Sequence, residues 1–233
     1  MPSATPTNFV ISAILAHPRR ADRVTVHVDR GRRLGAAVVD QRPLAVVSLQ
    51  AVQRLGVRCG DEATPELCQQ LEAEARALLT YDRATAMLAR GPRASRDLRQ
   101  RLLRKGDLPA DVDAALQRLK EIGVLDDEAF ARHVARCLLG GGRKASAGVQ
   151  GDLQRRGVPR ELAERATREV AIEEQVDEAG SALELARRRL RSLQSLDPLT
   201  QRRRLSAYLQ RRGFKTPQVM AAVAAVLSRS PSP

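Results

Sequence analysis

One short phrase occurs three times in this chain, and it constrains the fold more than any other feature of the sequence. The copies read Leu102-Leu103-Arg104-Lys105-Gly106, Leu153-Gln154-Arg155-Arg156-Gly157 and Leu209-Gln210-Arg211-Arg212-Gly213. An apolar residue, a proline and an amphipathic run follow each copy. The spacing is roughly 50 residues, which is the scale of tandem helical repeats. The chain is therefore predicted to use one supersecondary unit three times.

The pattern around each copy predicts three helices per repeat, and the phrase lies at the end of the middle helix. Glycine readily adopts the left-handed backbone that ends a helix, and proline suits the start of the next one. The predicted fold is mainly α, with tandem three-helix repeats and a small β-rich N-terminal module. Its parts are a flexible N-terminus over 1–8, the β-rich module over 9–64, a connecting helix over 65–80, repeats over 81–124, 125–172 and 173–227, and a disordered tail over 228–233.

Short β-like segments characterise the N-terminal module. Residues 23–29 alternate polar and apolar side chains, and further strands are expected over 9–16, 34–39 and 44–47. Ser48 is the expected N-cap of a short helix that stops at Gly56. A module of about 60 residues is marginal as an independent fold, so we expect it to pack on the helices that follow.

Helix signals inside the repeats place further residues. Ser95 is the expected N-cap of the first middle helix, and the third repeat is expected to open with a long helix over about 173–193. Hydrophobic spacing puts Ile122, Cys137 and Met220 on buried helix faces.

Composition favours helices and a reducing compartment. Aromatic residues make up only 2% of the chain, which leaves a core of Leu, Ala and Val and argues against stacking nucleic-acid bases on rings. The three cysteines have no C-x-x-C spacing and form no zinc pattern with the histidines. No stretch reaches transmembrane length. We therefore expect a cytoplasmic protein with no membrane association.

The formal net charge of +13 allows two interpretations. It is either a footprint for nucleic acid or another acidic surface, or a solvated face of an arginine-rich composition. At the repeated phrase, cations also suit a helix C-terminus, and this alone explains the position of the basic pair. The candidate contact residues are Arg104, Lys105, Arg155, Arg156, Arg187, Arg191, Arg202, Arg203, Arg204, Arg211 and Arg212.

Motifs for catalysis are absent from the sequence. It contains no G-x-x-x-x-G-K-[ST], G-x-G-x-x-G, G-x-S-x-G or H-E-x-x-H. The glycine-rich segment 140–144 lacks a preceding strand and a following Ser or Thr, so it is interpreted as a hinge. Asp126-Asp127-Glu128 suits a helix N-terminus better than a metal site. We expect a non-enzymatic protein with no catalytic residue, cofactor or metal.

Several segments, taken in order, resemble the bacterial RecX family over about residues 9–227. They are Ser95-Arg96-Asp97-Leu98 with the first basic phrase, Leu125-Asp126-Asp127-Glu128-Ala129-Phe130-Ala131, the second basic phrase with Val158, and Arg203-Arg204-Leu205-Ser206-Ala207-Tyr208-Leu209 continuing into Arg211-Arg212-Gly213-Phe214. The resemblance departs over residues 140–148, where the family usually has a basic, helix-friendly segment and this chain is rich in glycine, and again at Gly151, which falls inside the second middle helix. A glycine inside a helix costs about 1 kcal/mol relative to alanine, so the second repeat is expected to be loose or bent.

The resemblance implies a regulator of DNA repair, recombination and the SOS response. Members of the family bind the RecA recombinase filament, lie in its groove and suppress its ATPase, strand-exchange and co-protease activities. It also implies an elongated, curved array of repeats. The expected partners are the RecA filament and single- or double-stranded DNA, bound directly or through RecA, by a monomer.

Two alternatives stay open from the residues alone. One is a sequence-nonspecific DNA-binding protein that acts through an arginine-rich helical surface. The other is a helical-repeat adaptor whose charge is incidental.

Overall fold

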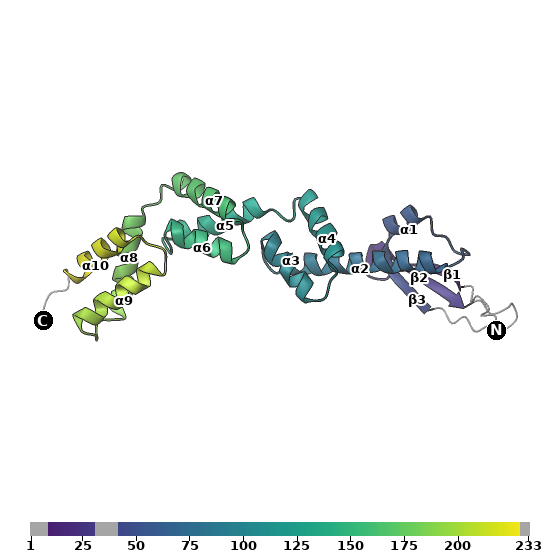
Figure 1. The fold of residues 1–233 in the computed structure, drawn as a ribbon, viewed down its shortest axis with the longest axis horizontal. Coiled ribbons are helices and arrows are strands. Elements are labelled where there is room, and N and C mark those ends of the chain that lie inside the picture. Colours follow the sequence, from purple (N-terminus) through teal and green to yellow (C-terminus); the bar gives the residue numbers. More distant parts are fainter. Residues whose placement is uncertain (1–8, 31–41, 229–233) are drawn as a thin grey trace, which may run out of the picture. The chain divides into compact units, whose positions relative to one another are not determined.

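The computed structural model describes residues 9–30 and 42–228, which form ten α-helices and one three-stranded antiparallel sheet (Figure 1). The predicted flexible start over 1–8, the predicted strand over 34–39 and nearly all of the predicted tail lie outside these residues. The elements are β1 (Phe9–His17), β2 (Arg20–Arg30), β3 (Arg42–Ser48), α1 (Leu49–Leu55), α2 (Pro65–Leu88), α3 (Ser95–Arg104), α4 (Pro109–Glu121), α5 (Asp127–Leu139), α6 (Ser146–Arg155), α7 (Arg160–Glu173), α8 (Glu178–Arg191), α9 (Pro198–Gln210) and α10 (Thr216–Leu227).

The N-terminal sheet has the order β1-β2-β3 and packs on helix α2. In register, Ile14 pairs with Val26 and Val24 pairs with Val47. Apolar side chains on one face of the sheet meet Leu71 of α2 in a shared core. Arg23, which is only 8% exposed, donates two hydrogen bonds to the carboxylate of Asp82 on α2. The expected dependence of this module on the following helices is therefore visible as both apolar packing and a partly buried ion pair.

Helix α1 begins and ends where the sequence indicates. The Ser48 hydroxyl accepts the Ala51 N–H at 3.1 Å, and Gly56 closes the helix with a φ of 67°. Helix α2 differs from the prediction, because the expected connecting helix and the first helix of the first repeat are one continuous element, Pro65–Leu88. No glycine or proline interrupts that span after its first residue, so nothing in the sequence forces a break near Tyr81.

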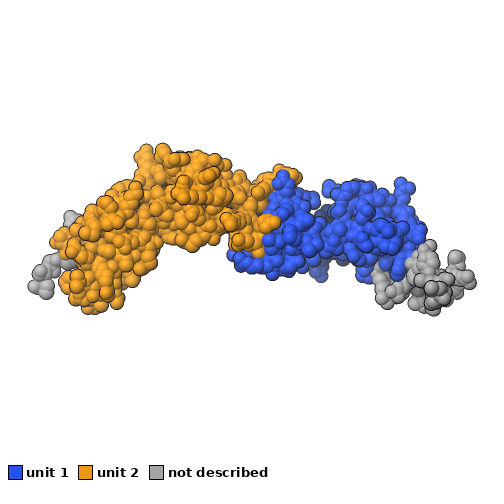
Figure 2. All heavy atoms as spheres, in the orientation of Figure 1, with its two compact units in different colours: residues 1–90, 101–118 blue, residues 91–100, 119–233 orange. Residues whose placement is uncertain are grey.

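The described chain divides into two compact units (Figure 2). Unit 1 comprises residues 1–90 and 101–118, and unit 2 comprises residues 91–100 and 119–233. Unit 1 contains the core under the sheet. Unit 2 contains one core formed chiefly by α5–α7, here called repeat 2, and another formed chiefly by α8–α10, here called repeat 3. The residue limits given above for the repeats remain predictions.

Three predicted core residues are exposed. Ile122 and Met220 are each 56% exposed, and Cys137 is also exposed. Ile122 follows the last residue of α4, so the helical period no longer governs it. In α5 and α10 the buried faces are formed partly by alanines, which a pattern based on large side chains overlooks.

The long helix predicted over about 173–193 is shorter in the structure, where α8 spans Glu178–Arg191. Helix α7 continues to Glu173, and a loop containing Gln175 with a φ of +46° separates it from α8. Asp177 then caps α8 by accepting the Gly180 N–H at 2.9 Å. None of the described helices is both long and apolar enough to cross a membrane.

Candidate basic interface

The three basic phrases adopt the same backbone geometry. Gly106, Gly157 and Gly213 have φ values of 87°, 89° and 86°, which confirms the predicted left-handed helix ends. In each case the glycine N–H donates to the carbonyl three residues earlier, at 3.0, 2.9 and 2.9 Å. The following N–H donates back to the leucine that opens the phrase. This pair of bonds satisfies the last carbonyls of the helix, so the glycine is needed for the chain to turn here.

The second and third phrases also pack against the preceding repeat. A Cβ atom at Gly157 would lie 3.1 Å from the Cβ of Arg96 in α3. A Cβ atom at Gly213 would lie only 2.1 Å from the backbone N of Gly148 in α6. At this second junction the Ala145 N–H also donates to the Arg212 carbonyl at 3.0 Å. The glycine therefore permits close approach between successive repeats as well as ending its own helix.

A carboxylate from the next repeat caps each of the first two middle helices, α3 and α6. Asp127 accepts the Ser95 backbone N–H at 2.7 Å, and Glu178 accepts the Ser146 backbone N–H at 2.7 Å. The prediction that Ser95 caps α3 with its own side chain is wrong. Ser95 is the first residue of the helix, and its buried hydroxyl has no hydrogen-bond partner among the described residues.

Glu178 is the more extensively bonded of the two carboxylates. Its second oxygen accepts the Gln218 side-chain amide at 3.1 Å. Burial raises the pKa of Glu178, but the Ser146 N–H, the Gln218 amide and the nearby Lys215 charge outweigh burial and hold its pKa below the ordinary value. The ionised form is therefore the one that holds α6, α8 and α10 together.

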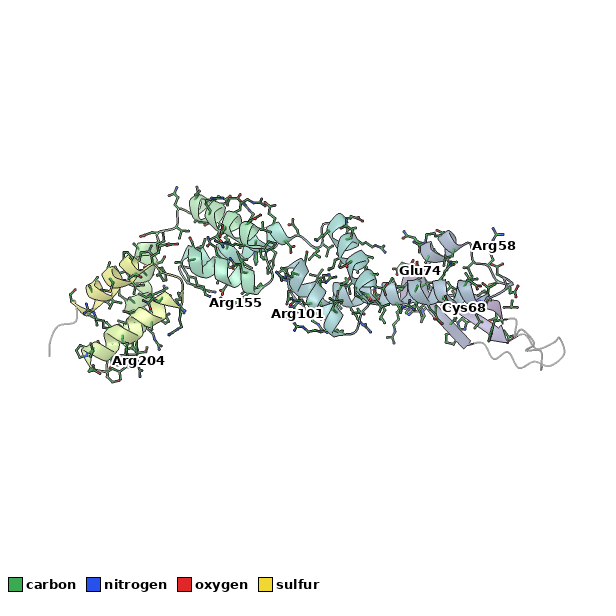
Figure 3. All side chains as sticks on the ribbon, in the orientation of Figure 1. Arg58, Cys68, Glu74, Arg101, Arg155 and Arg204 are labelled. Atoms are coloured by element: carbon green, nitrogen blue, oxygen red, sulfur yellow. The ribbon has the colours of Figure 1, made fainter. Side chains whose placement is uncertain are left out.

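Repeat 3 presents a set of arginines without acidic partners. We call them the arginine surface; they are Arg187, Arg191, Arg202, Arg203, Arg204 and Arg211, all exposed on α8, α9 and the residue that ends α9. Among the described residues, none of these six forms an ion pair. Arg204 is labelled on α9 in Figure 3. The structure places all six on or at the end of two helices that share one core with α10.

Tyr208 holds two further arginines beside this surface. The guanidinium of Arg212 lies 4.1 Å from the centre of the Tyr208 ring, and that of Arg189 lies 5.5 Å from it. Cation–π contacts of this kind fix the direction of a guanidinium without neutralising its charge. Arg189 was not among the sequence candidates; its place in the run of arginines on α8 is the only signal that could have selected it.

Repeat 2 has the opposite character on the face formed by α5 and α7. Arg132 pairs with Glu169 and Glu173, and Arg136 pairs with Glu173 and Glu174. Arg165 lies 3.1 Å from Glu128. The arginines of this face are therefore largely neutralised, in contrast to those of repeat 3.

Comparisons with known proteins identify the family. The third three-helix domain of RecX matches residues 177–223, which span most of repeat 3. Regulatory protein RecX of Syntrophotalea carbinolica is 33% identical over 136 residues, covering 58% of this chain and 87% of that protein. The chain belongs to the RecX family. A second member, regulatory protein RecX of Geobacillus kaustophilus, is 30% identical over 217 residues, covering 92% of this chain and 76% of that protein.

Solved RecX structures share the fold. The crystal structure of a regulatory protein RecX aligns with a TM-score of 0.70 at 18% identity, covering 93% of this chain and 99% of that one. RecX from Lactobacillus salivarius aligns with a TM-score of 0.52 at 13% identity, covering 65% of this chain and 96% of that one. The mainly α architecture with a small N-terminal sheet is therefore the RecX fold, as predicted.

The remaining candidates of this RecX-family chain lie at the first two joints. Arg104 and Lys105 are exposed at the end of α3. Arg155, labelled in Figure 3, pairs with Asp152, whereas Arg156 is exposed without an ion pair among the described residues. The sequence candidates omitted Arg96, which the structure brings to the Gly157 joint. Only the repeat-to-repeat packing places it there.

Proposed function

We propose that this protein is a non-enzymatic regulator that binds the RecA nucleoprotein filament along its groove. In this role it inhibits the ATPase, strand-exchange and co-protease activities of RecA in DNA repair and the SOS response. The observation that carries the proposal is the arginine surface of repeat 3, in a chain whose relatives are named regulatory proteins.

The charge contrast between the repeats supports this role. Guanidinium groups pair strongly with carboxylates and phosphates. An exposed arginine without such a partner can therefore pair with a carboxylate or phosphate of another molecule. Both groups are abundant on a protein filament formed on DNA. We therefore assign the main contact to repeat 3 and a lesser one to the α5–α7 face, whose arginines already have carboxylate partners.

The same surface favours one alternative, a protein that binds DNA without RecA and without sequence preference. Guanidinium groups contact backbone phosphates irrespective of the bases. The alternative predicts steeply salt-dependent binding to any duplex and no effect on RecA. We further propose that the protein acts in the cytoplasm as a monomer and needs no cofactor.

The test is the ATPase of RecA on single-stranded DNA with the full chain added below the concentration of RecA. We expect hydrolysis to slow, because a regulator bound along a filament affects many RecA subunits. An unchanged rate, in the presence of measurable DNA binding, would reject the RecA role in favour of the alternative.

A further inference from the structure

A polar hollow of about 260 Å³ lies where the second basic phrase meets the start of α3. Arg96, Asp97 and Gln100 line it from α3, and Gln154, Arg155 and Arg156 line it from the end of α6. Gly157, at the joint, completes the lining. All of these residues belong to unit 2. Repeat packing therefore brings residues at the start of α3 to residues at the end of α6, two segments that lie far apart in the sequence.

The charges in the hollow are only partly balanced. Arg155 pairs with Asp152, and Asp97 accepts a hydrogen bond from Arg93 at 3.2 Å. Arg96 and Arg156 are exposed and form no ion pair among the described residues. Two guanidinium groups thus line one hollow without a carboxylate partner of their own. Their mutual repulsion is relieved when an anion enters.

The donor set fits a phosphate group. A guanidinium offers a planar fork of N–H donors that matches two phosphate oxygens, and glutamine amides add neutral donors. No aromatic side chain is among the described residues that line the hollow, so it provides no platform for stacking a base. Such a site recognises a backbone and ignores its sequence.

The junction between repeats 2 and 3 lacks this arrangement. Here α6 takes the place that α3 has at the first junction. The positions of Arg96, Asp97 and Gln100 in α3 are occupied in α6 by Ala147, Gly148 and Gly151. The backbone there closes directly, with the Ala145 N–H donating to the Arg212 carbonyl. The two junctions therefore differ. Backbone contact closes the junction between repeats 2 and 3, whereas the junction between α3 and the end of α6 retains a charged hollow.

We propose that the hollow formed by Arg96, Gln100, Gln154, Arg155 and Arg156 binds a backbone phosphate of nucleic acid. This inference rests on the proposed function. It adds to that function a binding site for DNA that is separate from the arginine surface of repeat 3.

The experiment measures binding of the full chain to a fluorescent oligothymidylate of about 20 nucleotides at several KCl concentrations, without RecA. For the R96A/R156A variant we expect affinity to fall on the order of tenfold. The slope of log affinity against log salt should become shallower by about 0.7 for each phosphate that the variant no longer neutralises. The Q100A/Q154A variant should bind several-fold more weakly with an unchanged slope, because it removes only neutral donors.

The matched control is R136A/R160A, which removes two arginines that already have glutamate partners. It should keep both the affinity and the slope of the wild type. Equal reductions in R96A/R156A and the control would overturn the proposal, because the effect would then be one of net charge. An unaffected Q100A/Q154A variant would also contradict a defined pocket.

A titration with inorganic phosphate tests whether the hollow binds the free anion instead of nucleic acid. If it shifts the Gly157 amide resonance while the oligothymidylate does not, the assignment to nucleic acid is overturned. Because RecA is absent, the outcome is separate from the ATPase test. If the wild type inhibits RecA but R96A/R156A keeps the salt slope of the wild type, only the phosphate site in the hollow is refuted. If the wild type binds DNA in a salt-dependent way but does not inhibit RecA, only the proposed function is refuted.

Discussion

At the scale of single residues, the two glycines of α6 have different tasks. A Cβ atom at Gly148 would lie 2.1 Å from the Arg212 carbonyl oxygen, which is backbone and cannot easily move. A Cβ atom at Gly151 would meet only the end of the Arg155 side chain, at 3.4 Å. Gly148 lowers the stability of the helix but permits close packing between repeats. No such contact explains Gly151.

These surroundings predict opposite effects for the same substitution. G148A should lower the free energy of unfolding by about 2 kcal/mol, because the methyl group forces α6 away from the third joint. G151A should raise it by roughly 0.5–1 kcal/mol, because alanine is the better helix former. Urea denaturation of the full chain measures both. Stabilisation by G148A would show that the approach at the joint is not close in solution.

At the scale of elements, each middle helix of the first two repeats depends on a carboxylate from the repeat that follows. Asp127 serves α3 and Glu178 serves α6. Because the capping group comes from outside the helix, neither helix end is complete until the next repeat has folded against it. We therefore expect neighbouring repeats to unfold together.

The pKa of Glu178 makes this capping contact sensitive to acid. Its folded pKa is lowered, so its contribution is fully present above the unfolded value of about 4.3 and disappears as pH falls through the folded value. E178Q should lower the free energy of unfolding by about 1 kcal/mol at pH 7. The difference from wild type should shrink as pH falls below about 4.

The matched control is E184Q, because Glu184 is exposed and pairs with Arg188 on its own helix. Chemical denaturation at a series of pH values measures both variants against wild type. A constant difference for E178Q down to about pH 3 would contradict the role of its charge.

At the scale of the whole molecule, the repeated phrase was sufficient to predict the helical-repeat architecture. Its glycines and prolines are local signals that determine where helices begin and end, and its recurrence shows that the same unit is used again. The strand over 23–29 was predictable for the same reason, from its alternation. Buried alanines such as Ala135 and Ala222 were not, since a small side chain carries little hydrophobic signal.

The candidate site was less accessible to sequence reasoning. Which arginines are neutralised depends on partners in other helices, as for Arg132 with Glu173 across α5 and α7. The hollow at Arg96 depends on packing between repeats, and nothing local to Arg96 indicates it. Sequence could therefore name the arginines, but only the three-dimensional arrangement separates paired from unpaired ones.

The central claim is that the unpaired arginines of repeat 3 carry binding to the RecA filament. The direct measurement is the affinity of the full chain for RecA filaments on single-stranded DNA, comparing R202A/R203A/R204A/R211A with the control R132A/R136A/R160A/R165A. Both variants remove four positive charges, but the control removes only arginines with glutamate partners. We predict that the repeat-3 variant binds at least about tenfold more weakly while the control stays within about twofold of wild type. Equal affinities for the two variants would contradict the claim.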